Sequence, residues 1–249
     1  MSATVTSYYA GEVNGKPVAH YRLVNSCMSV VVSEYGATVM SIQTPDKDGV
    51  CEEITLQCKS LNDIVEAQQA GTFPYFGSVV GRVANRIAKG TFELDKTVYT
   101  GLGINNGPNS LHGGAVGFDQ KIFDSQAVQL KNATGVTFSY KSMDGEENYP
   151  GTVCIKVQYL LTNDNKMVIS YSGEALDKPT LLNLTNHCYF NLSGNFKRST
   201  LDHTLQLSCN RYLPVDEFSI PTGNLQAVSH SPFDFTTTKP LGKAAKMIG

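Results

Sequence analysis

Apolar and polar residues alternate along much of the chain. One such stretch places four apolar side chains on the same side: Val153, Ile155, Val157 and Tyr159. The same alternation recurs in residues 136–140, 167–171 and 205–209. A period of two is typical of β-strands that bury one face. The pattern therefore predicts a series of half-buried strands.

Short turn motifs separate these predicted strands. Asn-Asp-Asn at residues 163–165 predicts a hairpin, and Asp-Gly at residues 144–145 predicts another turn. Only residues 60–70 suggest a helix, in which Ser60 can cap the first turn and Asp63 occupies the favourable third position. Many short strands with little helix favour an all-β fold, a large antiparallel β-sandwich. Because no segment resembles a linker, we expect one domain over residues 1–249.

The composition agrees with such a fold. The 249 residues are enough to form a hydrophobic core without a disulfide or metal staple. Charged residues make up 17% of the chain, below the roughly 25% usual for soluble proteins. The 20 basic and 22 acidic side chains give a net charge of −2, which offers no attraction to nucleic acid or anionic lipid.

Other features exclude several classes of protein. No segment approaches the roughly 18 consecutive apolar residues of a membrane span, and the first residues lack the basic start and apolar run of a signal peptide. The six cysteines form no CxxC pair, so we expect reduced thiols. These features predict a cytoplasmic protein with neither a membrane nor a nucleic-acid partner.

The first cluster of useful polar residues lies at residues 81–87. Arg82, Asn85 and Arg86 supply fixed hydrogen-bond donors and one amide that can donate and accept. In an extended segment the arginines would share one face and Asn85 the other, whereas a turn would bring Asn85 and Arg86 to the same site. Pairing of the arginines with surface carboxylates is an equally weighted alternative.

The second cluster surrounds His112. Asn-Gly-Pro-Asn at residues 106–109 must turn sharply, and Gly113 and Gly114 leave the imidazole unshielded. Such a histidine is well placed for a ligand, although a lone histidine is more often a surface or core residue, so both interpretations stay open. No further ligand stands at metal-binding spacing from it, and we expect no metal site.

The third cluster lies at residues 181–192. Strict alternation would place four polar side chains on one strand face: Asn183, Thr185, His187 and Tyr189. This face is too polar for a sandwich core and has no charge, unlike an ordinary solvent face. A sugar site needs paired donors and acceptors for hydroxyls, with aromatic walls for the ring. The alternative is a hydrogen-bonded polar network in the core.

Together these clusters resemble the aldose 1-epimerase (galactose mutarotase) family. The matching strings, in chain order, are YGATVMSIQTPDKDG, GRVANRIAKGTF, NGPNSLHGG with GFD, NLTNHCYFNLSG, IPTG and PFDF. The resemblance implies a galactose mutarotase-like supersandwich. It also implies an isomerase of hexose metabolism, acting without cofactor or metal and as a monomer. Such an enzyme interconverts the α and β anomers of free hexoses, such as galactose and glucose.

The resemblance also implies roles for four residues. His187 would be the general acid that protonates the ring oxygen, and His112 would bind and polarise a neighbouring sugar oxygen. Asn85 and Arg86 would hold hydroxyls of the same ring. The family's general base is a glutamate near its C-terminus, and no residue of this chain corresponds to it. We therefore expect a C-terminally truncated chain whose final strands are missing.

The missing base leaves the activity of the chain itself open. Asp119 and Asp234 lie within matching motifs but not at the position of the base, so neither is assigned to that role. The truncated chain could itself be inactive, or the protein could be a non-catalytic sugar-binding protein of the same fold. A hexose-6-phosphate epimerase is disfavoured by the match at residues 186–192.

Overall fold

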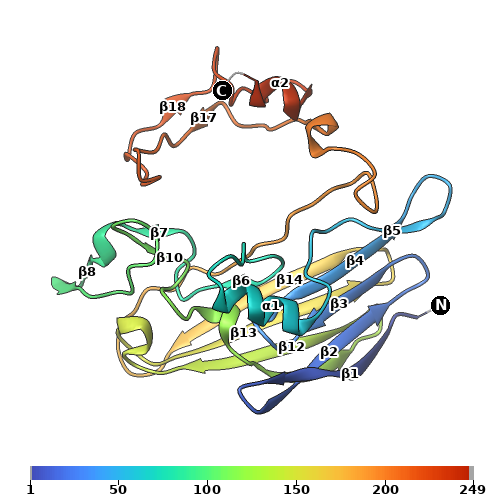
Figure 1. The fold of residues 1–249 in the computed structure, drawn as a ribbon, viewed down its shortest axis with the longest axis horizontal. Coiled ribbons are helices and arrows are strands. Elements are labelled where there is room, and N and C mark those ends of the chain that lie inside the picture. Colours follow the sequence, from blue (N-terminus) through green and yellow to red (C-terminus); the bar gives the residue numbers. More distant parts are fainter. Residues whose placement is uncertain (1, 247–249) are drawn as a thin grey trace. The chain divides into compact units, whose positions relative to one another are not determined.

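The computed structural model describes residues 2–246 (Figure 1). The chain divides into two units, an N-terminal unit (Met1–Phe190) and a C-terminal unit (Asn191–Gly249). Residues 1 and 247–249 lie outside the described residues, and the predicted truncation stays a prediction. The single domain over residues 1–249 stays a prediction.

Two antiparallel sheets form most of the N-terminal unit. The first has strand order β1-β2-β3-β4-β5 and the second β11-β12-β13-β14. The first sheet comprises β1 (Thr4–Val13), β2 (Lys16–Val24), β3 (Ser29–Ser33), β4 (Val39–Pro45) and β5 (Cys51–Glu53). The second comprises β11 (Asp124–Gln129), β12 (Ala133–Ser142), β13 (Val153–Thr162) and β14 (Met167–Ala175).

The two sheets share one core (Figure 1). Leu23 and Val32 of the first sheet belong to the same buried cluster as Phe138 of the second. In β13, Val153, Ile155, Val157 and Tyr159 are all at most 1% exposed. Burial of one face of each sheet against the other is the geometry of a sandwich. The predicted antiparallel sandwich is confirmed.

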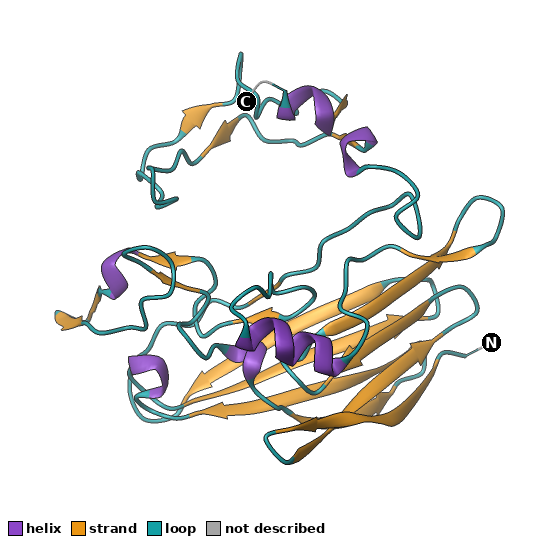
Figure 2. Cartoon of the chain, viewed as in Figure 1, coloured by secondary structure: helices purple, strands orange, loops and turns teal. Residues whose placement is uncertain are grey.

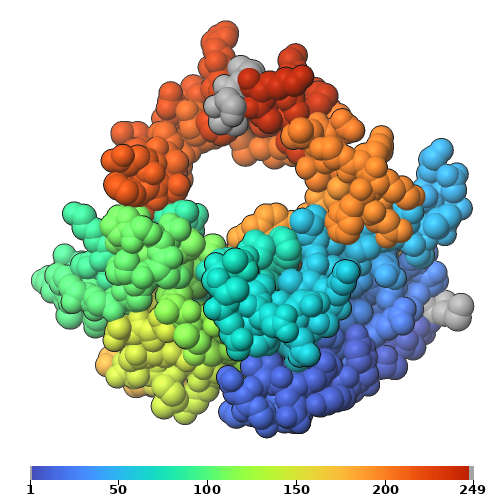
Figure 3. Space-filling model, viewed as in Figure 1, coloured from blue at the N-terminus to red at the C-terminus, as the bar shows by residue number. Residues whose placement is uncertain are grey.

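The predicted turns and helix are also present. Residues 163–165 join β13 to β14 as a hairpin, and the Asp-Gly turn at residues 144–145 precedes the 3-10 turn η3 (Glu146–Asn148). Helix α1 (Leu61–Gln69) begins after Ser60, whose hydroxyl accepts a hydrogen bond from the Asp63 N–H at 3.2 Å. Its side chains Leu61 and Ile64 pack in a second buried cluster with Val13 and Val18 of β1 and β2. Figure 3 shows this helical segment, in cyan, against the blue N-terminal strands.

Short ribbons complete the N-terminal unit. Strand β6 pairs with β15, β7 with β10 and β8 with β9. Their bounds are β6 (Val79–Val80), β7 (Arg86–Ile87), β8 (Phe92–Leu94), β9 (Thr97–Tyr99), β10 (Ser110–Leu111) and β15 (Thr185–Asn186). Two 3-10 turns accompany them, η1 (Ala88–Gly90) and η2 (Phe118–Gln120).

The C-terminal unit consists mainly of loops (Figure 2). Its elements are η4 (Thr200–Asp202), β16 (Thr204–Leu205), β17 (Arg211–Tyr212), β18 (Gln226–Ala227), β19 (Lys239–Pro240) and α2 (Leu241–Ala245). The strand predicted from alternation in residues 205–209 is wrong beyond Leu205, and Cys209 is exposed. Helix α2 was not predicted.

Within residues 2–246, no helix is long and apolar enough to cross a membrane. The six cysteines are free.

Candidate functional site

Residues 77–87 hold the third polar cluster in place from one side. The His187 N–H donates to the Ser78 carbonyl at 2.9 Å, and the Gly77 N–H donates to the His187 carbonyl at 3.2 Å. These bonds extend the pairing of β15 with β6. The backbone on both sides of His187 is therefore fixed relative to this segment.

The C-terminal end of the same segment, residues 85–87, holds His112 in place. Strand β7 pairs with β10, and the His112 N–H donates to the Asn85 carbonyl at 3.0 Å. Because both histidines are bonded to residues 77–87, clusters far apart in the sequence meet at one site.

The imidazoles of His112 and His187 lie side by side. Their ring centroids are 5.3 Å apart, with the ring planes at 90°. The Tyr189 ring lies 5.0 Å from that of His187. Tyr75 lies 4.7 Å from the His112 ring and 5.9 Å from the His187 ring. The predicted histidines thus form a pair flanked by two tyrosine rings.

The hydrogen bonding of His112 defines its tautomer. The Asn85 N–H donates to Nδ1 of His112 at 3.0 Å, so the neutral ring carries its proton on Nε2. Burial, assisted by the nearby His187 and Arg86, lowers the pKa of His112 to about 4. At neutral pH His112 is therefore an uncharged hydrogen-bond donor through Nε2, which suits binding and polarising a sugar oxygen.

Asn85 and Arg86 lie together beside His112. Asn85 has a left-handed backbone, with φ of 66°. The chain therefore turns at Asn85 instead of continuing as an extended strand. Nη1 of Arg86 donates to Oδ1 of Asn85 at 3.2 Å, and its Nε donates to Oδ1 of Asn106 at 2.8 Å. The first cluster therefore presents an amide and a guanidinium on the same side, as the turned alternative predicts.

Arg82 has a different role from Arg86. Its side chain is 2% exposed, and Nη1 donates to the carbonyls of Pro150 and Gly151 at 2.9 and 2.8 Å. Nη2 donates to the Ser142 hydroxyl at 2.6 Å. Pairing with a surface carboxylate is therefore wrong for Arg82, which instead ties residues 81–82 to the β12–β13 connection.

The third cluster keeps most of its predicted alternation. Leu184 and Cys188 pack against the core, whereas Thr185 and Tyr189 on the other face are exposed. Leu182 departs from the pattern and is exposed. Burial raises the pKa of the Cys188 thiol to about 12, so it is protonated at neutral pH and is no nucleophile.

Two carboxylates of the matching motifs have unlike surroundings. Asp119 is 2% exposed and accepts a hydrogen bond from Nε2 of Gln68 at 3.3 Å. Its burial raises the pKa of the carboxyl to about 7. Asp234 is half-buried in the C-terminal unit and accepts a hydrogen bond from the Thr236 hydroxyl at 2.6 Å. Neither is assigned as the general base.

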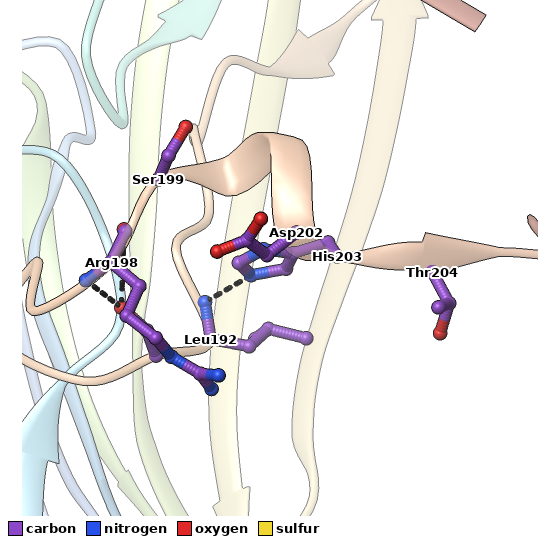
Figure 4. Close-up of a pocket in the computed structure, with 7 residues that line it drawn as sticks. Leu192, Arg198, Ser199, Asp202, His203 and Thr204 are labelled. Carbon is purple, nitrogen blue, oxygen red and sulfur yellow. Dashed lines mark hydrogen bonds between the residues drawn. The ribbon is translucent and has the colours of Figure 1, made fainter. Parts of the chain in front are cut away.

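A separate cavity of about 260 Å³ lies within the C-terminal unit (Figure 4). Nε2 of His203 accepts a hydrogen bond from the Leu192 N–H at 2.8 Å. Arg198 and Asp202 also line this cavity, which includes none of the four predicted site residues. Among residues 2–246, no group of three or more His, Cys, Asp or Glu side chains is placed to hold a metal ion.

The fold is that of the galactose mutarotase-like sandwiches. The solved structure of galactose 1-epimerase from Lactobacillus acidophilus NCFM matches with a TM-score of 0.85 at 29% identity, covering 98% of this chain and 68% of that chain. The family model for aldose 1-epimerase matches residues 19–247. The chain belongs to the aldose 1-epimerase family.

Two curated relatives agree. Galactose mutarotase of Bos taurus is 41% identical over 226 residues, which cover 91% of this chain and 63% of the relative. Aldose 1-epimerase of Escherichia coli (strain K12) is 38% identical over 230 residues, which cover 91% of this chain and 62% of the relative. The chain thus spans a little under two thirds of the length of these relatives.

One neighbour of the histidine pair was absent from the sequence prediction. Tyr75 lies in a loop with Phe73 and Phe76 and belongs to no alternating stretch. A run of three aromatic residues within Phe-Pro-Tyr-Phe-Gly at residues 73–77 was the signal that could have identified it.

Proposed function

We propose that the protein is an aldose 1-epimerase, an isomerase that interconverts the α and β anomers of free hexoses such as galactose and glucose. The observation that carries this proposal is the pair of imidazoles 5.3 Å apart, beside the Asn85 amide and the Arg86 guanidinium. Relatives named galactose mutarotase and aldose 1-epimerase support it.

The reaction opens and recloses the pyranose ring. A base removes the C1 hydroxyl proton while an acid protonates the ring oxygen, and the aldehyde then rotates about the C1–C2 bond. Closure on the other face reverses the two proton transfers. An imidazole suits the acid role because histidine ordinarily titrates near neutral pH. We assign this role to His187.

The other residues bind and orient the sugar. His112 donates from Nε2 to a neighbouring sugar oxygen, while Asn85 and Arg86 hold hydroxyls. We assign the general base to no residue of this chain, so the proposal covers the acid and binding side of the site. The reaction moves only protons, and we propose neither cofactor nor metal.

The proposal also covers domain organisation, location, oligomeric state and partner. We propose that the two units are parts of one aldose 1-epimerase domain, since the family match runs through both of them. We also propose a cytoplasmic monomer. Its partner is a small aldose sugar rather than nucleic acid or a membrane.

Polarimetry tests the activity directly. Freshly dissolved α-galactose or α-glucose should equilibrate faster with the protein than in buffer, in proportion to protein concentration. His187→Asn should lower the catalysed rate about 100-fold or more, because a positioned acid contributes about 10²–10⁴-fold. Exposed His230 of the C-terminal unit gives the matched control, and His230→Asn should retain the rate.

Two results would count against the proposal. The first is an equal rate of anomer equilibration with and without protein, together with galactose binding measured by calorimetry. That result would indicate a non-catalytic sugar-binding protein. Full activity of His187→Asn would remove the assignment of His187 as the acid.

A further inference from the structure

The Tyr75 ring contacts both histidines of the site. Its centroid lies 4.7 Å from that of His112 at an interplanar angle of 67°, and 5.9 Å from that of His187 at 30°. Edge-to-face and tilted ring pairs at such distances are favourable and directional. The ring of Tyr75 can therefore restrict the orientation of both imidazoles.

The backbone connects Tyr75 to His187 as firmly as the ring does. The Ser78 N–H donates to the Tyr75 carbonyl at 3.1 Å, and the next bonds along this turn run between Gly77, Ser78 and His187. A Cβ on Gly77 would lie 2.0 Å from the Val39 carbonyl oxygen. The turn that carries Tyr75 is thus fixed on one side by His187 and on the other by β4.

Tyr75 has a backbone conformation that its side chain disfavours. Its φ is 61°, in the left-handed region that glycine and asparagine adopt far more readily than tyrosine. The backbone of this turn alone would favour one of those two, so backbone preference does not account for the tyrosine.

Tyr75 also lines a cavity of about 190 Å³. Gln68, Asn105 and Asp119 line it together with Tyr75, so it is polar enough to hold water. Tyr75 therefore lines this cavity and also contacts both imidazoles. A residue in this position can limit the access of water from the cavity to His112.

We propose that Tyr75 is a positioning residue, whose ring holds the imidazoles of His112 and His187 in their mutual orientation and shields them from the adjoining polar cavity. This proposal rests on the proposed aldose 1-epimerase function for its effect on rate. Its effect on the histidines themselves is independent of activity.

Two kinds of substitution distinguish the effect of the Tyr75 ring from the effects of its hydroxyl and of its backbone conformation. Tyr75→Gly removes the ring and suits the left-handed φ, so the turn is retained; Tyr75→Asn is a second ring-free variant with the same backbone preference. Tyr75→Phe keeps the ring and removes only the hydroxyl. Tyr21→Ala is the matched control, since Tyr21 is also half-buried but packs on Phe138 in the core.

The first measurement is the titration of the five histidines by NMR without sugar. The groups that face His112 are His187, Arg86 and Tyr75. Since burial is the main cause of the low pKa of His112, about 4, the ring-free variants should raise it above about 5. Tyr75→Phe and Tyr21→Ala should leave it near the wild-type value.

The second measurement is kcat by polarimetry at saturating sugar. The ring-free variants should lose about 10–100-fold in kcat, because small misplacements of catalytic groups cost rates of this size, and Tyr75→Phe should restore most of it. The proposal is overturned if a folded ring-free variant keeps both the His112 titration and kcat. It is also overturned if Tyr75→Phe is as impaired as Tyr75→Gly. A wild-type protein without activity would defeat the proposed function, while the titration would still decide the role of Tyr75.

Discussion

The two units differ in how their chains bury apolar surface. In the N-terminal unit, ten-residue strands such as β12 and β13 pair along their whole length and share a large core. In the C-terminal unit each strand has two residues. Its buried hydrophobic residues within residues 191–246 are Val228, Phe235 and Ala244, while several large ones are exposed, among them Leu192, Leu213 and Leu225.

This difference explains where the candidate site lies. Asn85, Arg86, His112 and His187 all belong to the N-terminal unit, in or directly beside its short strands β7, β10 and β15. A site that depends on the mutual orientation of rings needs supporting residues whose own positions are fixed by packing and hydrogen bonds. The N-terminal unit supplies that support from its own residues.

Truncation of a large apolar side chain should show the greatest contrast between the units. Phe138 is 0% exposed and Leu225 is 62% exposed. Phe138→Ala should lower the free energy of unfolding by about 3–5 kcal/mol, through lost burial and the cavity left behind. Leu225→Ala should change it by less than about 0.5 kcal/mol. Urea unfolding measures both, and equal losses would contradict the contrast.

The second-largest contrast between the units should be in how the stability depends on pH, and it concerns a buried carboxyl of the N-terminal unit. Burial raises the pKa of Asp119 from 3.8 to about 7, so the folded state retains a proton that the unfolded state has lost. Asp119 therefore stabilises the fold below pH about 4, and this stabilisation is lost as pH rises to about 7. Relative to Asp119→Asn, the wild-type protein should lose up to about 4 kcal/mol across that range.

Two controls isolate the contribution of Asp119. Burial lowers the pKa of His20 and His112 to about 4, which adds stability as pH rises, but both histidines are common to the wild type and the variant. Asp234→Asn should change the pH profile little and in the opposite sense, because the Thr236 hydroxyl lowers the pKa of that carboxyl. Parallel profiles for wild type and Asp119→Asn would contradict the assignment.

The smallest contrast concerns two serine caps. Ser60 caps the nine-residue helix α1 and Ser199 caps the single 3-10 turn η4. Ser60→Ala should lower the free energy of unfolding by about 1 kcal/mol, whereas Ser199→Ala should change it by less than about 0.5 kcal/mol. Thermal unfolding of the two variants measures both effects. A larger loss of stability for Ser199→Ala than for Ser60→Ala would contradict this prediction.

Alternation predicted the strands of the N-terminal unit because each has a long partner. In β13, apolar residues at every second position meet the core, and β12 and β14 pair with it over most of its length. Residues 205–209 alternate similarly, but their partner β19 is only two residues long and includes Pro240. Proline has no N–H to continue a ladder. A single-sequence pattern does not show whether a partner edge exists.

The candidate site was predictable as a set of residues but not as an arrangement. Clusters of polar residues and glycine identified Asn85, Arg86, His112 and His187, and their resemblance to a family implied their roles. The contact between the two imidazoles arises from backbone pairing on both sides of residues 77–87. Tyr75 was missed because aromatic residues in a loop have no periodicity that distinguishes a site from packing.

The anchoring of both histidines to one short segment has a consequence for folding. Pairing beside His112 closes a loop between residues 27 apart in sequence, whereas pairing beside His187 joins residues 109 apart. By loop-closure entropy alone, the longer closure costs about 1.2 kcal/mol more. Distant pairings of this kind slow folding. The His112 side can therefore assemble early from local contacts, and the histidine pair is complete only once the long-range closure has occurred.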